Sequence, residues 1–237
     1  MDGSFMYVDP PASVDQHLAN EEITLDNRGW VAYHWTSSRH NVHLDSEDVA
    51  TAELHRFIAA GGRTVVDPTN KGLGRDPEPL VRIAKVTGAH IIVGAGYYLG
   101  GTHPDDMSDR TTDSIADEIV ADIQVGIDKT DVKAGLIGEI GCTYPWLPNE
   151  KKSLRAAVAA QVETGAPLMV HPGRDPISPV EISVDPNLSF LVTLPLPEEP
   201  LRRSARTRRW HLAIQHLQVA HAPRVLAPRS PCRIWRG

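Results

Sequence analysis

Two side chains that bind metal ions in many proteins come at the ends of short apolar runs. Glu139 lies in residues 135–141 (GLIGEIG), and His171 follows the apolar residues 168–170. Runs of this length, bounded by glycine or proline, predict buried strands. A helix-sized segment separates them, so we expect parallel neighbouring strands roughly 5 Å apart. In α/β folds the chemistry lies at the carboxyl ends of such strands, where both side chains would stand.

The carboxylate and the imidazole have two interpretations. An ionised carboxylate inside an apolar run is unfavourable unless it is paired or bound to a cation, and a histidine one strand over is a suitable second donor for a divalent metal. Alternatively, His171 is a hydrogen-bonded structural residue and Glu139 lies on an exposed face. The spacing of the residues leaves both interpretations open.

The elements that must position these side chains follow an alternating pattern. Glycine-bounded apolar runs predict strands at residues 64–67 and 90–94, ahead of the two strands described above. Apolar residues at helical spacing predict helices over residues 47–60, 77–88, 113–127 and 150–164. Strands that alternate with helices predict right-handed βαβ units and a parallel sheet.

Composition excludes several classes of protein. The 237 residues are 41% hydrophobic and 23% charged, which is ordinary for a globular chain. The cysteines, Cys142 and Cys232, form no disulfide framework, and the N-terminus shows no signal peptide, so a cytoplasmic location is expected. No apolar run is long enough to cross a membrane. The net charge of −6 makes nucleic-acid binding an unfavoured function.

The two ends of the chain differ from its centre. Residues 1–45 predict an irregular, partly helical lead-in, where His40 and His43 are interpreted as surface residues. Residues 46–178 hold the strand–helix pattern, and residues 179–237 form a divergent tail that is expected to be disordered. Nine arginines and no lysine occur in residues 180–237, with a basic patch at 202–209. The alternatives for this tail are a nuclear-localisation or nucleic-acid-binding segment and a frame-shifted or alternatively spliced terminus.

Five blocks of sequence together resemble the phosphotriesterase-like branch of the amidohydrolase superfamily, and most closely the phosphotriesterase-related proteins. They are residues 60–68 (AGGRTVVDP), 74–76 (GRD), 94–98 (GAGYY), 135–142 (GLIGEIGC) and 171–174 (HPGR). The resemblance covers residues 25–178. It implies an α/β fold of the (β/α)8 TIM-barrel type, incomplete here, with strands two to five present and an irregular tail rich in arginine and proline.

The resemblance implies a metal-dependent hydrolase of small molecules that cleaves ester, lactone, amide or phosphoester bonds. In this family a carboxylate at the end of strand four bridges two divalent ions, and Glu139 matches it; the strand-five histidine matches His171. Zinc is the expected metal, and the family site is binuclear. Tyr97, Tyr98 and Arg174 lie at strand ends, where they contact substrate or, alternatively, serve packing and ion pairing.

The chain also departs from the family pattern. The His-x-His of strand one, the strand-six histidine and the strand-eight aspartate have no recognisable counterparts, and no ligand role is assigned to histidines of the tail. We therefore expect weak metal binding and little or no hydrolysis. The alternative is a non-catalytic truncated isoform or a gene-model artefact with a basic tail. The open edges of an incomplete barrel are expected to promote self-association.

Overall fold

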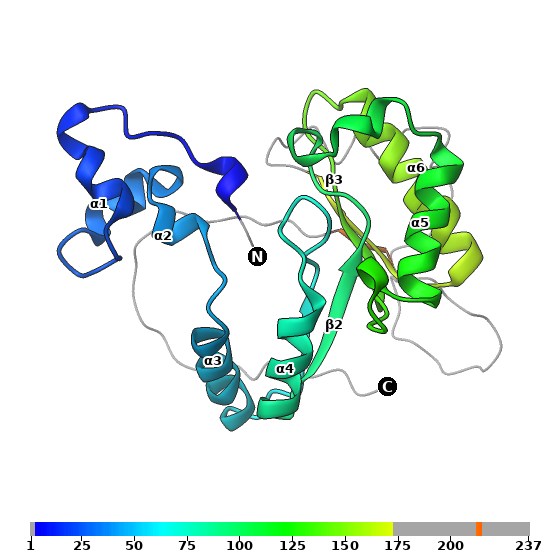
Figure 1. The fold of residues 1–237 in the computed structure, drawn as a ribbon, viewed down its shortest axis with the longest axis horizontal. Coiled ribbons are helices and arrows are strands. Elements are labelled where there is room, and N and C mark those ends of the chain that lie inside the picture. The colour runs from blue at the N-terminus through cyan, green and yellow to red at the C-terminus, as the bar shows by residue number, and fades with distance from the viewer. Residues whose placement is uncertain (1–2, 173–211, 215–237) are drawn as a thin grey trace, which may run out of the picture.

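The computed structural model describes residues 3–172 and the backbone of residues 212–214 (Figure 1). Its sheet has five strands that pair in chain order, and every pairing is parallel. The strands are β1 (Thr64–Asp67), β2 (His90–Ala95), β3 (Leu136–Gly141), β4 (Leu168–His171) and β5 (Leu212–Ile214). The curved parallel sheet with helices between its strands is the predicted incomplete (β/α) barrel.

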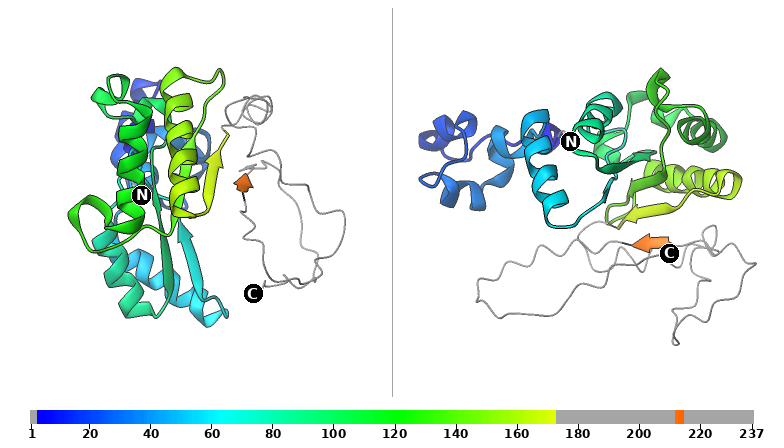
Figure 2. Two further views of the ribbon diagram at one scale, coloured as in Figure 1. Left: turned by 90° about the vertical axis from the view of Figure 1, so that its right-hand side faces the viewer. Right: turned by 90° about the horizontal axis from the view of Figure 1, so that it is seen from below.

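Four longer helices accompany the strands: α3 (Glu47–Ala59), α4 (Pro77–Thr87), α5 (Thr112–Gln124) and α6 (Pro148–Thr164). Figure 2 shows α4, α5 and α6 on one face of the sheet. Their ends follow local rules. The Asp76 carboxylate accepts a hydrogen bond from the Glu78 amide and caps α4, Pro77 occupies the first turn, and Gly88 ends the helix at φ +71°.

The core lies between the sheet and helices α5 and α6, which pack side by side (Figure 1). Small side chains on α6, including Ala156, Ala157 and Ala160, are fully buried and let α5 approach closely. Ile115 and Ile119 of α5 meet Ile137 and Ile140 of β3 in the same cluster. Each fully buried isoleucine stabilises the fold by about 1.5–3 kcal/mol relative to exposure, so this layer holds β3 in place.

The third predicted helix was too long at its end. We expected it to reach residue 127, but α5 ends at Gln124, Gly126 is extended, and a short 3-10 turn, η6 (Ile127–Lys129), follows. Asp128 has positive φ inside this turn. Ile127 is nevertheless fully buried, and its amide donates to the Val132 carbonyl. The four-residue spacing of isoleucines thus continues past the end of the helix, because Ile127 is buried from the turn that follows.

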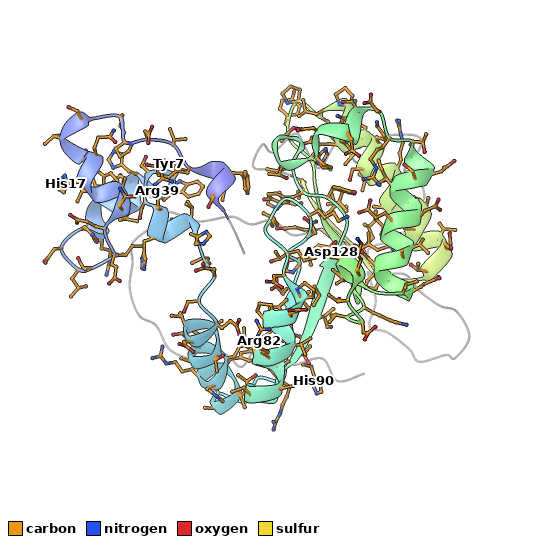
Figure 3. The ribbon with its side chains drawn as sticks, in the orientation of Figure 1. Tyr7, His17, Arg39, Arg82, His90 and Asp128 are labelled. Atoms are coloured by element: carbon orange, nitrogen blue, oxygen red, sulfur yellow. The ribbon has the colours of Figure 1, made fainter. Side chains whose placement is uncertain are left out.

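The lead-in consists of short helices. They are η1 (Ser4–Met6), η2 (Ser13–Asn20), α1 (Arg28–Tyr33), η3 (Trp35–Ser37) and α2 (Arg39–Val42). The Arg39 guanidinium lies 3.8 Å from the centre of the Tyr7 ring (Figure 3). His40 and His43 are exposed, in line with the surface role predicted for them.

Two further turns, η4 (Gly100–Thr102) and η5 (Asp105–Ser108), follow β2. In the tail, where no strand was predicted, β5 pairs with β4 in the register Leu168 to Leu212. The predicted boundary at residue 178 and the basic patch at 202–209 lie outside the described residues. Among the described helices, none has the length and apolar character needed to span a membrane.

Candidate metal-binding site

Glu139 and His171 meet at the carboxyl ends of neighbouring strands. Oε2 of Glu139 lies 3.3 Å from Nδ1 of His171, and their side chains are 14% and 15% exposed. His171 is the register partner of Gly141, two residues beyond Glu139 on β3. The sequence predicted this convergence, and the structure brings both donors to the same edge of the sheet.

A bulge in β3 gives Glu139 its direction. Ile137 pairs with Leu168 and Ile140 pairs with Val170, so β3 holds one residue more than β4 over the same stretch. A bulge of this kind turns a side chain out of the simple alternation of a strand. Both Ile137 and Ile140 therefore enter the core, while Glu139 remains free to face His171.

Glycine makes the bulge possible. Gly138 has φ +133°, a conformation that side chains with a Cβ rarely adopt. A Cβ at this position would also collide with the carbonyl oxygen of Met169 on β4. The glycine before Glu139 in the GLIGEIG motif is thus a requirement of the backbone that presents the carboxylate.

The two tyrosines after β2 lie in different surroundings. The ring of Tyr98 is centred 5.3 Å from the ring of His171, beside the candidate site. Tyr97 is buried and donates its hydroxyl to Glu118 of α5 at 2.8 Å, so it does not reach the site. Burial raises the pKa of the Tyr97 hydroxyl above its ordinary value. Successive residues of an extended chain point to opposite sides, which separates the pair; Arg174 lies outside the described residues.

A cluster of ion pairs lies where the loop after β1 meets α5. The Arg75 side chain is 1% exposed and donates to Asp122 at 2.7 Å and to Asp128 at 3.0 Å. Lys71 pairs with Glu118 in the same cluster. Burial lowers the pKa of Lys71 and raises that of Asp122, the latter against the opposing effect of Arg75. These charges pair within the fold and anchor the loop.

The side chains of Glu139 and His171 are donors of the types that suit a zinc ion, but there are only two of them at this place among the described residues. One carboxylate oxygen and one imidazole nitrogen are the donor types that zinc accepts in proteins. Within residues 3–172, no group of three or more His, Cys, Asp or Glu side chains could hold a metal ion together. Asp67, at the end of β1, already accepts hydrogen bonds from the amide and hydroxyl of Thr69.

Sequence reasoning missed Asn70. This residue lies in the loop after β1, is fully buried, and donates its side-chain amide to the backbone carbonyl of Glu139 at 2.6 Å. The signal in the sequence was Gly94, because a glycine inside a strand often marks the close approach of another backbone. Here that backbone is the loop that carries Asn70, since a Cβ at residue 94 would lie 2.9 Å from the Pro68 oxygen.

Comparison with known proteins agrees with the fold. The Phosphotriesterase family model matches residues 4–184. An N-acetyltaurine hydrolase of Dictyostelium discoideum is 42% identical over 70% of this chain and 45% of its own length. A phosphotriesterase-related protein of Nematostella vectensis is 41% identical over 77% of this chain and 53% of its own length.

A solved structure shows the same likeness. A resiniferatoxin-binding protein from Rhodobacter sphaeroides superposes with a TM-score of 0.72 at 44% identity, over 74% of this chain and 49% of that one. The chain spans about half the length of the curated relatives it matches. The family match covers well over half of the chain, so this protein belongs to the phosphotriesterase family.

Proposed function

We propose that this chain carries part of a metal-dependent hydrolase site, in which Glu139 and His171 bind a divalent ion, with zinc the expected metal. The observation that carries this proposal is the 3.3 Å approach of the two side chains, both largely buried, on adjacent strands. A bound ion of this kind lowers the pKa of a coordinated water and polarises the bond to be cleaved. Glu139 supplies negative charge there and His171 a neutral nitrogen donor.

Tyr98 contributes to the arrangement of the site. Its ring packs on the His171 ring at 52° and restricts the orientations that the imidazole can adopt. Tyr98 and Arg174 remain our candidates for substrate contacts, whereas the hydrogen bonds of Tyr97 give it a packing role. Reaction at an ester, lactone, amide or phosphoester of a small molecule is proposed, and the N-acetyltaurine hydrolases among the relatives favour the amide. The two cysteines support a cytoplasmic place of action.

The number of donors sets the expected activity. Catalytic zinc sites normally use at least three protein ligands, and a two-metal site needs more. The described residues offer Glu139 and His171 at this place. We therefore propose weak binding of one ion and no appreciable hydrolysis by this chain, and this count favours a non-catalytic fragment as the second candidate function.

Metal content and turnover test the proposal together. Zinc retained after dialysis is measured by mass spectrometry for the full chain and for Glu139→Gln and His171→Asn. Matched controls are Glu78→Gln and His90→Asn, because both residues are exposed and His90 lies at the start of β2 (Figure 3). We expect less than one zinc per chain, lost in both site variants and kept in both controls.

Turnover is measured on N-acetyltaurine, a lactone, an aryl ester and a phosphotriester. We expect rates at background for the wild-type chain and for all four variants. Zinc that persists in both site variants would refute the assignment of the ligands. Two tightly held ions per chain, lost together with activity in Glu139→Gln, would refute the proposed incompleteness of the site.

A further inference from the structure

The loop after β1, residues 68–75, reaches across β2 to β3. The Glu139 amide donates to the Pro68 carbonyl at 3.0 Å, and the Asn70 side chain donates to the Glu139 carbonyl at 2.6 Å. In the sheet, β2 lies between β1 and β3. The crossing is possible because residue 94 is glycine: a Cβ there would collide with the Gly138 carbonyl oxygen and lie 2.9 Å from the Pro68 oxygen.

The loop replaces strand pairing at Glu139. The register between β2 and β3 pairs Gly94 with Leu136 and Ala95 with Ile137. On the other side, the register between β3 and β4 shifts between Ile137 and Ile140. Buried backbone groups require partners, and here the loop supplies them for both the amide and the carbonyl of Glu139.

Asn70 is well placed to fix this peptide. Its side chain is fully buried, and its Oδ1 has no hydrogen-bond partner among the described residues. At the next residue, the Lys71 amide donates to the Gly96 carbonyl at 3.2 Å, and the Lys71 carbonyl accepts from the Tyr98 amide at 3.2 Å. The ion pairs of Arg75 with Asp122 of α5 and Asp128 of η6 anchor the far end of the loop.

We propose that Asn70 is a positioning residue for Glu139: its amide holds the Glu139 peptide in the bulge so that the carboxylate faces His171. The preceding Gly138 is conformationally permissive, so the segment lacks stiffness of its own and depends on this bond. The effect on metal binding rests on the function proposed above; the effect on the backbone does not. Partners that orient metal ligands typically change metal affinity by about 10–100-fold.

The test uses Asn70→Leu, which has similar volume and removes both the donor and the unpaired acceptor. Asn70→Ala serves as a second variant in case leucine is not tolerated. The matched control is Asn41→Leu, because the Asn41 side-chain amide also donates to a backbone carbonyl, that of Trp35 at 3.0 Å, within the lead-in.

The first measurement is hydrogen exchange of the metal-free full chain, followed by mass spectrometry of the peptide that covers residues 136–141. We expect exchange there to rise at least about 10-fold in the Asn70 variants, while β1 and the control remain unchanged. A merely structural role would accelerate exchange across the sheet, β1 included. That outcome, or unchanged exchange at 136–141, would overturn the proposal.

The second measurement is titration with Co²⁺, followed by its visible absorption. We expect affinity to fall about 10–100-fold in the Asn70 variants and to stay unchanged in Asn41→Leu. Equal affinity in the Asn70 variants and the wild type would overturn the proposal. If the wild type binds no cobalt, the proposed function fails, and the exchange data of the metal-free chain still decide the role of Asn70.

Discussion

Replacement of the buried carboxylate Glu150 by glutamine should destabilise the fold strongly. Glu150 lies in the first turn of α6 and is fully buried. One oxygen accepts from the Gly100 amide at 2.8 Å. The other accepts from the amide and hydroxyl of Thr143 at 2.9 and 2.8 Å and from the Leu147 amide at 3.3 Å. This side chain therefore joins the loop after β2 to the loop after β3.

The magnitude follows from these contacts. A glutamine must point its NH2 group at donors in either orientation, and the less costly one leaves the Gly100 amide unpaired. A buried unpaired donor costs about 1–3 kcal/mol. The three remaining bonds lose their charge assistance, which roughly doubles the strength of such bonds. We expect Glu150→Gln to lower the free energy of unfolding by about 2–4 kcal/mol.

Thermal unfolding followed by circular dichroism measures the effect. For a chain of this size, the expected loss corresponds to a fall in Tm of about 5–15 °C. Glu78→Gln is the control because Glu78 is exposed, and surface changes of this kind stay within about 0.5 kcal/mol. A Tm for Glu150→Gln equal to that of the control would show that the carboxylate does not bind these donors, and the reasoning would be refuted.

Two further predictions concern packing and pH. Gly94→Ala places a methyl group against the Gly138 carbonyl and the Pro68 oxygen, so it should destabilise the fold by at least about 1–3 kcal/mol in urea denaturation. Gly29→Ala, where a Cβ meets nothing within 4 Å, should be neutral or stabilising. Burial lowers the pKa of His103 below its ordinary value of 6.5. As the pH falls, the imidazole is therefore protonated in the unfolded chain at a higher pH than in the folded chain. The free energy of unfolding should therefore fall as pH drops from 7.5 to 5.5, and His103→Gln should reduce that fall; an equal fall in both proteins would contradict this.

The sequence predicted the fold well where pattern and packing agree. Strands β1 to β4 lie at the expected positions, because glycine-bounded apolar runs have few other structures open to them. The end of α5 was wrong because Ile127 is buried from a turn, and helical spacing alone cannot distinguish that arrangement from a longer helix. Self-association through the sheet edges stays a prediction.

The proximity of Glu139 and His171 was predictable from the sequence, and the residues that support it were not. Parallel neighbouring strands bring Glu139 and His171 to the same edge of the sheet, so their proximity could be expected from two short motifs, whereas the bulge that turns Glu139 toward His171 could not. Alternation could have separated Tyr97 from Tyr98, because adjacent extended residues face opposite sides. Asn70 could not be found by spacing, since its role depends on a loop that crosses a whole strand.

The order of the strands has a consequence for how the chain acquires its structure. In the described sheet, each strand from β2 to β5 pairs with the strand that precedes it along the chain. The strands can therefore be added one after another during synthesis. The bond from Asn70 to Glu139 joins residues 69 apart and can form only after β3 has joined the sheet. Contacts between residues so far apart in the sequence form slowly, because a long loop must close first. We therefore expect the geometry around Glu139 to mature late in folding, after the strands that surround it have paired.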